Sequence, residues 1–216
     1  MNLSKLNAKF VGLFIIITYL SLVISGIILA PLLDAPDILA VIFPNALMWQ
    51  VGVYVELGNA IGVLGIALFM YPFLKEYHKG LALFYVGIRL VESIFSAIAS
   101  MSRLLLIDIS SAYLDAGSPS NSYYQGLADF ALAIYHWAFE MPTVFFLIGA
   151  VLFYFLLEQT ELVPRYITIW GYIAVIALLI LNIFGAFLGV IAFVFALPII
   201  TNEIFLAIWL IAKGDF

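Results

Sequence analysis

Charged and polar side chains recur at helical spacing within the third long hydrophobic segment, GIRLVESIFSAIASMSRLLLID. Arg89 and Glu92 open this series and Arg103 ends it, with serines at positions 93, 96 and 100 between them. Steps of three and four residues place side chains on one face of an α-helix. The segment therefore predicts a helix with one polar face. Arg89 and Glu92 could serve on that face as an ion pair that only fixes helix packing, or as part of a functional site.

A second polar series interrupts the fourth hydrophobic segment, around the stretch HWAFEMP at residues 136–142. His136 and Glu140 are four residues apart, a spacing that points both side chains to one side of a helix and suits a shared metal ion. Asp129 falls on the same predicted face, seven residues before His136. The stretch lacks the second histidine of an HExxH zinc motif, so a histidine simply packed in the protein interior is the simpler alternative.

Further polar residues lie in the second and sixth segments. Glu56 and Asn59 are one helical turn apart in the second, and Glu203 follows Pro198 in the sixth. From a rise of about 1.5 Å per residue, one charged set is expected near the middle of the membrane: Arg89, Glu92, Glu140 and Glu203. Another is expected nearer the outer leaflet: Glu56, Arg103, Asp129 and His136. We therefore expect a polar interior with two layers, because charged groups at membrane depth normally face the inside of a bundle.

The deeper layer would combine three carboxylates with one guanidinium. Arg89 can pair with one carboxylate through two parallel hydrogen bonds. An ionised carboxylate without a partner is very unfavourable in a medium of low dielectric constant, so the other two must take up protons or bind a cation. The predicted site therefore favours protons, a metal ion, or a cationic or hydrogen-bonding ligand.

Composition indicates what surrounds these residues. Of the 216 residues, 66% are hydrophobic and only 10% are charged, whereas about a quarter of a soluble domain is charged. Most of the chain must therefore face lipid, which makes the lipid bilayer its first expected partner. The absence of cysteine excludes disulfides and thiolate chemistry, and the lack of a basic run argues against nucleic acid as a partner.

Six segments are long enough to cross a bilayer, which requires about 20 apolar residues. They are expected at residues 10–32, 51–74, 80–107, 124–157, 166–187 and 190–212, within one domain over residues 1–216. We therefore predict an all-α polytopic membrane protein, a bundle of six transmembrane helices. Arg89 and Arg103 lie inside the third segment. The other basic residues all fall on one side of the membrane under this count: Lys5, Lys9, Lys75, Lys79, Arg165 and Lys213. Because cytoplasmic loops are enriched in lysine and arginine, both termini are expected in the cytoplasm.

Most of the chain also resembles one known family, through GIRLVES, VFFLIGAVLFYFLLEQTELVPRYITIWGY and LPIITNEIFLAIWLIAKG, with FVGLFIIITYLSLVISGI near the start. These stretches are similar to a bacterial family of integral membrane proteins catalogued as domain of unknown function 4386. The positions that match its landmarks are Arg89, Glu92, His136, Pro164, Arg165, Pro198 and Glu203. Glu56 and Glu140 have no clear place in the family pattern. The resemblance implies a six-helix protein of the bacterial inner membrane, and it implies no activity.

Three functions remain open at this point. The leading hypothesis is a protein that binds or transports a small molecule, a proton or a cation at a buried site on the third, fourth and sixth segments. Arg89 would hold Glu92 or an anionic group, Glu140 and Glu203 would carry protons or a cation, and His136 would relay protons. The second is an intramembrane enzyme with a divalent metal held by His136, Glu140 and Glu203. The third is a structural subunit of a homo- or hetero-oligomeric assembly.

Overall fold

The computed structural model describes residues 3–119 and 123–213, and these residues are helical almost throughout. Within the described part of the chain, five helices are long and apolar enough to cross a membrane. They are α1 (Leu3–Leu33), α3 (Ala46–Asp115), α4 (Tyr123–Gln159), α5 (Arg165–Leu188) and α6 (Ala192–Lys213). The chain is thus an all-helical protein of the multi-pass membrane type. Its ends (1–2 and 214–216), predicted to be cytoplasmic, and positions 120–122 of the predicted third loop lie outside the described residues.

Helix α3 is assigned as one run of 70 residues, but it is interrupted at His78, whose backbone angles (φ −153°, ψ 102°) are not helical. The amide of Leu81 donates a hydrogen bond of 3.1 Å to Nδ1 of this histidine. An extended residue whose side chain accepts from an amide three positions later is the arrangement of a helix N-cap. His78 therefore ends one arm of α3, residues 46–77, and caps the next, residues 79–115. The predicted segments 51–74 and 80–107 correspond to these two arms.

The described helices divide into two compact units. The Arg89 unit comprises Met1–Ile17, Gly62–Glu92 and Thr143–Phe216, and the Glu56 unit comprises Thr18–Ile61 and Ser93–Pro142. Helices α1, α3 and α4 each contribute to both units, whereas α5 and α6 belong to the first alone. The expected single domain over residues 1–216 stays a prediction.

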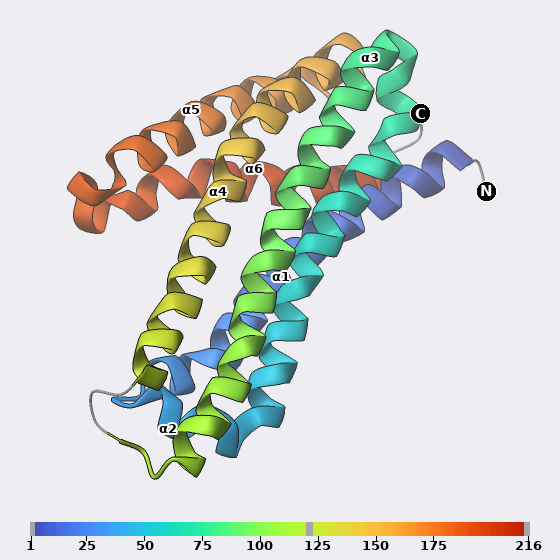
Figure 1. Ribbon diagram of the computed structural model, residues 1–216. Helices are drawn as coiled ribbons and strands as arrows, with labels where there is room; N and C mark the ends of the chain where they lie inside the picture. Colours follow the sequence, from blue (N-terminus) through green and yellow to red (C-terminus); the bar gives the residue numbers. More distant parts are fainter. Residues whose placement is uncertain (1–2, 120–122, 214–216) are drawn as a thin grey trace. The chain divides into compact units, whose positions relative to one another are not determined.

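In the Arg89 unit, α5 and α6 form an antiparallel hairpin and run side by side (Figure 1). Gly189, between them, has a φ of +51°, a conformation that glycine adopts without steric cost. The short 3-10 helix η2 (Gly189–Ile191) begins at this residue. The N-terminal half of α1 packs tightly on α6, because a Cβ atom at Gly12 would lie 2.6 Å from the carbonyl oxygen of Ala207. Close approach of this kind is typical of small residues between membrane helices.

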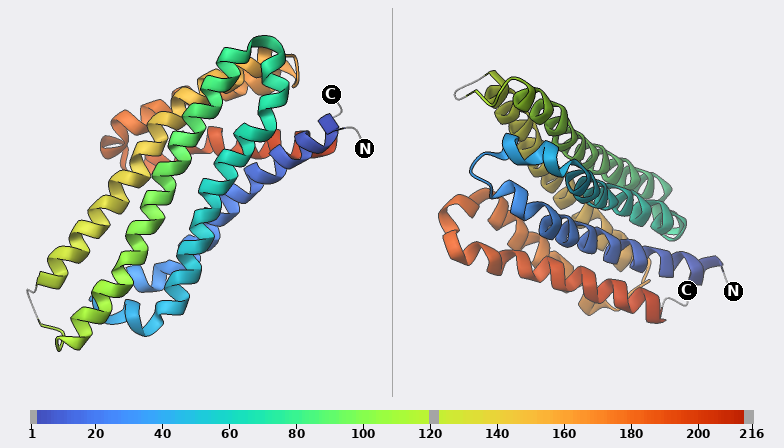
Figure 2. Two further views of the ribbon diagram at one scale, coloured as in Figure 1. Left: turned by 45° about the vertical axis from the view of Figure 1, so that its right-hand side comes forward. Right: turned by 90° about the horizontal axis from the view of Figure 1, so that it is seen from below.

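In the Glu56 unit, the two arms of α3 lie side by side (Figure 2), and Oγ of Ser93 on one arm donates a hydrogen bond of 2.8 Å to the carbonyl of Ala60 on the other. The connection from α1 to α3 contains the short helices α2 (Ile38–Ile42) and η1 (Phe43–Asn45), where the sequence predicted only a loop. Asp37 caps α2 through the amides of Leu39 and Ala40. One hydrophobic core cluster lies within this unit: Leu29, Leu32, Leu39, Ile42, Trp49, Val53, Leu106 and Tyr113, with Ala128 and Ala131 of α4.

Candidate functional site

A buried ion pair lies on the second arm of α3 within the Arg89 unit. Nη1 of Arg89 is 3.0 Å from Oε2 of Glu92, and each residue is 5% exposed. The guanidinium also lies over the ring of Phe146 on α4, 5.4 Å from its centroid. One positive charge is therefore held between a carboxylate and an aromatic face, two environments that both favour a cation.

A small cavity opens beside this pair. It is lined by Tyr85 and Arg89 of α3, Glu203 of α6 and apolar residues of four helices: Ile15, Ile66, Phe146, Ala150, Phe153 and Leu206. Its volume of about 10 Å³ is close to what one water molecule requires. Arg89 and Glu203 are the charged side chains among the described residues that line it. The cavity therefore accommodates a water molecule or a proton carrier, and it is too small for an organic ligand.

Glu203 lies beside the ion pair, because it lines the same cavity as Arg89. It is partly buried, whereas Arg89 and Glu92 are buried. The site thus combines two carboxylates with one guanidinium in a region packed mainly with apolar side chains. If Arg89, Glu92 and Glu203 were all ionised, these three groups together would carry a net charge of −1, which is unfavourable at low dielectric constant.

Asn202, the residue before Glu203, fixes this part of α6 to two other helices. The hydroxyl of Tyr154 donates a hydrogen bond of 2.6 Å to Oδ1 of Asn202, and Nδ2 of Asn202 donates one of 3.0 Å to the carbonyl of Ile167. Asn202 and Tyr154 are completely buried. Gly171 of α5 packs against the Tyr154 ring so closely that a Cβ atom there would collide with it. These contacts position Glu203 relative to α4 and α5.

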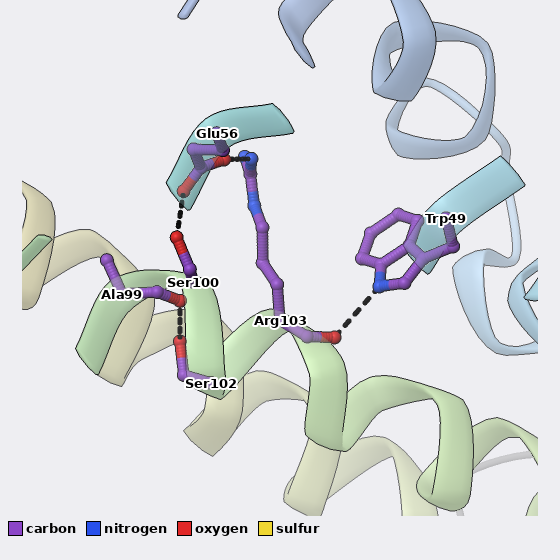
Figure 3. Close-up of polar contacts among 6 residues, drawn as sticks. All are labelled: Trp49, Glu56, Ala99, Ser100, Ser102 and Arg103. Carbon is purple, nitrogen blue, oxygen red and sulfur yellow. Dashed lines mark hydrogen bonds and ion pairs between the residues drawn. The ribbon is translucent and has the colours of Figure 1, made fainter. Parts of the chain in front are cut away.

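The Glu56 unit holds a second buried ion pair, which joins the two arms of α3 (Figure 3). Nη1 of Arg103 contacts Oε2 of Glu56, and Oγ of Ser100 donates a hydrogen bond of 3.3 Å to Oε1 of the same carboxylate. The guanidinium stacks on Tyr135 of α4, with Cζ 3.6 Å from the ring centroid. The structure thus pairs Arg103 with Glu56, another member of the predicted outer layer.

This second pair has one acid for one base, and a further hydrogen bond fixes the backbone of Arg103. Nε1 of Trp49 donates a hydrogen bond of 2.8 Å to the carbonyl of Arg103. Glu56 is 5% exposed and Arg103 is 9% exposed. A matched, stacked and hydrogen-bonded pair of this kind holds helices in register without needing a further ligand.

The structure corrects the expected orientation of the HWAFEMP stretch. The side chains of Asp129, His136 and Glu140 are exposed, so they do not line a buried interior together with the other predicted residues. The inward face of α4 in the Glu56 unit consists of small residues and one tyrosine: Ala128, Ala131, Tyr135 and Ala138. Small residues let α4 pack closely on its neighbours, and the helical repeat then turns the three ionisable residues away from that face. Asn59, also predicted for the outer layer, is partly buried.

The predicted metal ligands come from both units, His136 and Glu140 from the Glu56 unit and Glu203 from the Arg89 unit. Among the residues that the structure describes, which include His136, Glu140 and Glu203, no three histidine, aspartate or glutamate side chains are grouped so that they could hold a metal ion. The metal-assisted enzyme, whose ligands would be these three residues, therefore stays a hypothesis.

Sequence reasoning missed the aromatic residues of both sites. Tyr85, Phe146 and Tyr154 in one unit, and Trp49 and Tyr135 in the other, resemble ordinary core or interfacial residues in an apolar sequence. One signal was available, because Tyr85 precedes Arg89 by four residues and so shares its helix face. The partners on α4 carry no such signal, since their proximity depends on tertiary packing.

A comparison with protein families identifies one match. A family model described as Domain of unknown function (DUF4386) matches residues 10–214, which is nearly the whole chain. No curated protein and no solved structure matches the chain.

Proposed function

The chain belongs to the DUF4386 family, and on that premise we propose that it binds and transfers protons at the buried site formed by Arg89, Glu92 and Glu203. The observation that carries this proposal is that Glu203 lines a cavity the size of one water molecule beside Arg89, which is already paired with Glu92. Arg89 compensates one carboxylate, and a proton shared between the two acids compensates the other. A single proton held between two nearby carboxylates is a known solution to this electrostatic problem.

The cavity lining favours a proton over a larger occupant. Metal cations such as Mg²⁺ or Ca²⁺ require six or more oxygen ligands, whereas the described lining is mainly aliphatic and aromatic. A drug-sized organic molecule occupies a pocket of about 300 Å³ or more. A proton needs only an oxygen atom on which to reside, and Glu203 supplies one at the cavity wall.

We assign the Glu56–Arg103 pair a structural role. Its charges are matched, its guanidinium is stacked on Tyr135, and it joins the two arms of α3. These two buried ion pairs would therefore serve different purposes, one in proton chemistry and one in holding helices together.

The proposal includes a membrane topology of six crossings, with each arm of α3 counted as one. The break at His78 lies between Lys75 and Lys79, and Arg165 begins α5. These basic residues favour the cytoplasm for that side of the protein. Both termini would then be cytoplasmic, and the protein would reside in the bacterial inner membrane.

Proton transfer can be tested with purified protein in liposomes that enclose a pH-sensitive dye. When a membrane potential is imposed, wild-type protein is expected to acidify or alkalinise the interior faster than empty liposomes do. Glu203→Gln should reduce this rate to that of empty liposomes, whereas the matched control Glu76→Gln, at an exposed carboxylate of α3, should not change it. Equal rates for wild type and empty liposomes would contradict proton transfer.

A further inference from the structure

A pocket lies at the turn between α4 and α5 in the Arg89 unit. Glu158, Glu161, Val163 and Arg165 line it, and it has a volume of about 360 Å³. This volume admits many water molecules. Oε1 of Glu158 is 3.3 Å from Nε of Arg165, and the side chains of these two residues are 29% and 79% exposed. The carboxylate of Glu158 thus stands at the boundary between bulk water and the helices.

Glu158 is connected to the interior through Tyr172 of α5. The hydroxyl of Tyr172 donates a hydrogen bond of 3.4 Å to Oε2 of Glu158. The ring of Tyr172 meets the ring of Tyr154 edge to face, with centroids 6.1 Å apart. Tyr172 therefore contacts both the carboxylate at the boundary and the buried tyrosine.

Tyr154 continues this series to the proposed proton site. Its hydroxyl donates to Asn202, which directly precedes Glu203 on α6. Around Tyr154 pack further aromatic side chains, since Phe153 stacks on Tyr85 at 5.3 Å and Tyr85 lines the cavity. Within the Arg89 unit, hydroxyl and carboxyl groups thus extend from the α4–α5 turn to the cavity.

We propose that protons reach the buried site from the α4–α5 turn, with Glu158 as the entry group and the hydroxyls of Tyr172 and Tyr154 as relays. The inference rests on the proposed function of the buried site and adds its access route. When Glu158 takes a proton from bulk water, its hydrogen bond to Tyr172 reverses, so that the acid donates to the tyrosine oxygen and the hydroxyl of Tyr172 turns to release its own proton inward. We place one water molecule between the hydroxyls of Tyr172 and Tyr154 and another between Tyr154 and Glu203. Each hydroxyl gains one proton and loses one, so no net charge remains on either tyrosine.

The route can be tested by the rate at which the buried carboxyl group exchanges its proton for deuterium. Reconstituted protein is transferred rapidly from H₂O to D₂O, and the infrared carbonyl band of the protonated acid is followed as it shifts on deuteration. Glu158→Gln and Tyr172→Phe should slow this exchange several-fold while leaving the position and size of the band unchanged. Asp129→Asn, which alters an exposed carboxylate of the Glu56 unit, should exchange like the wild type.

The outcomes separate the route from the site. Wild-type exchange rates in both Glu158→Gln and Tyr172→Phe, with the band present, would overturn the route and leave the buried proton site intact. Absence of the band from the wild type would remove the site and the route together. Slower exchange in these two variants, but not in the control, would support both.

Discussion

The hydroxyl of Tyr154 donates a hydrogen bond of 2.6 Å to Oδ1 of Asn202, the neighbour of Glu203 on α6. This bond joins α4 to α6, and the Asn202 amide continues it to the backbone of α5. The acid of the proposed proton site is therefore placed by a buried, uncharged network rather than by its own helix alone.

Removing this network is expected to destabilise the protein. Tyr154→Phe deletes one hydrogen bond and should lower the free energy of unfolding by about 1 kcal/mol. Asn202→Leu leaves the Tyr154 hydroxyl without its acceptor and removes the bond to the Ile167 carbonyl, and should cost about 1–3 kcal/mol. Unfolding of the purified variants by denaturant in detergent measures both values. A larger loss in Tyr154→Phe than in Asn202→Leu would contradict the assignment of Asn202 as the central member.

The Glu56–Arg103 pair should be essential for stability. Truncating one partner leaves a buried charge alone, which typically costs about 3–5 kcal/mol. Arg103→Leu and Glu56→Leu are therefore each expected to unfold at much lower denaturant concentration. The double variant should recover a substantial part of the loss, because it removes both charges. If the two single losses simply add in the double variant, the residues do not act as a pair.

The exposed position of Glu140 leads to a prediction about metal. Because the described residues include no group that could hold a metal ion, wild type and Glu140→Ala should have the same divalent metal content after gentle purification. Elemental analysis of both proteins, prepared side by side, gives the answer. One equivalent of metal that disappears in Glu140→Ala would restore the metal-assisted enzyme hypothesis.

The proposed topology can be tested because the chain has no cysteine of its own. Single cysteines introduced at Asp34 and Glu76 occupy exposed positions beyond α1 and beside the break in α3. In intact bacterial cells, a maleimide that cannot cross membranes should label Asp34→Cys. It should label Glu76→Cys only after the membrane is broken. The reverse pattern would place the termini outside the cell.

The sequence predicted the long helices closely, because apolar length and polar interruptions are local properties. The segments expected at 124–157 and 166–187 correspond to α4 (Tyr123–Gln159) and α5 (Arg165–Leu188). The sequence did not predict how the second and third segments connect. His78 had no assigned role, yet it breaks α3 and caps its second arm. Helix α2 was missed because five residues are too few to give a periodic pattern.

The candidate site was predicted in part. Helical spacing placed Glu92 beside Arg89, and the structure pairs them. Helical spacing did not predict the exposure of His136 and Glu140. Spacing shows which residues share a face of a helix but not which face packs inward. On α4 the alanines and Tyr135 determine the inward face, so the more polar face points outward. The contact between Arg103 and Tyr135 depends on packing between helices that spacing along one helix cannot specify.

The most direct test of the proton site is the infrared carbonyl band of a buried, protonated carboxyl group at neutral pH. The wild type should show this band, since two acids share one guanidinium. Glu203→Gln should lose it, because Glu92 then remains as the single acid paired with Arg89, whereas Glu140→Gln should keep it. A band that persists in Glu203→Gln, or that is absent from the wild type, would contradict a shared proton at this site.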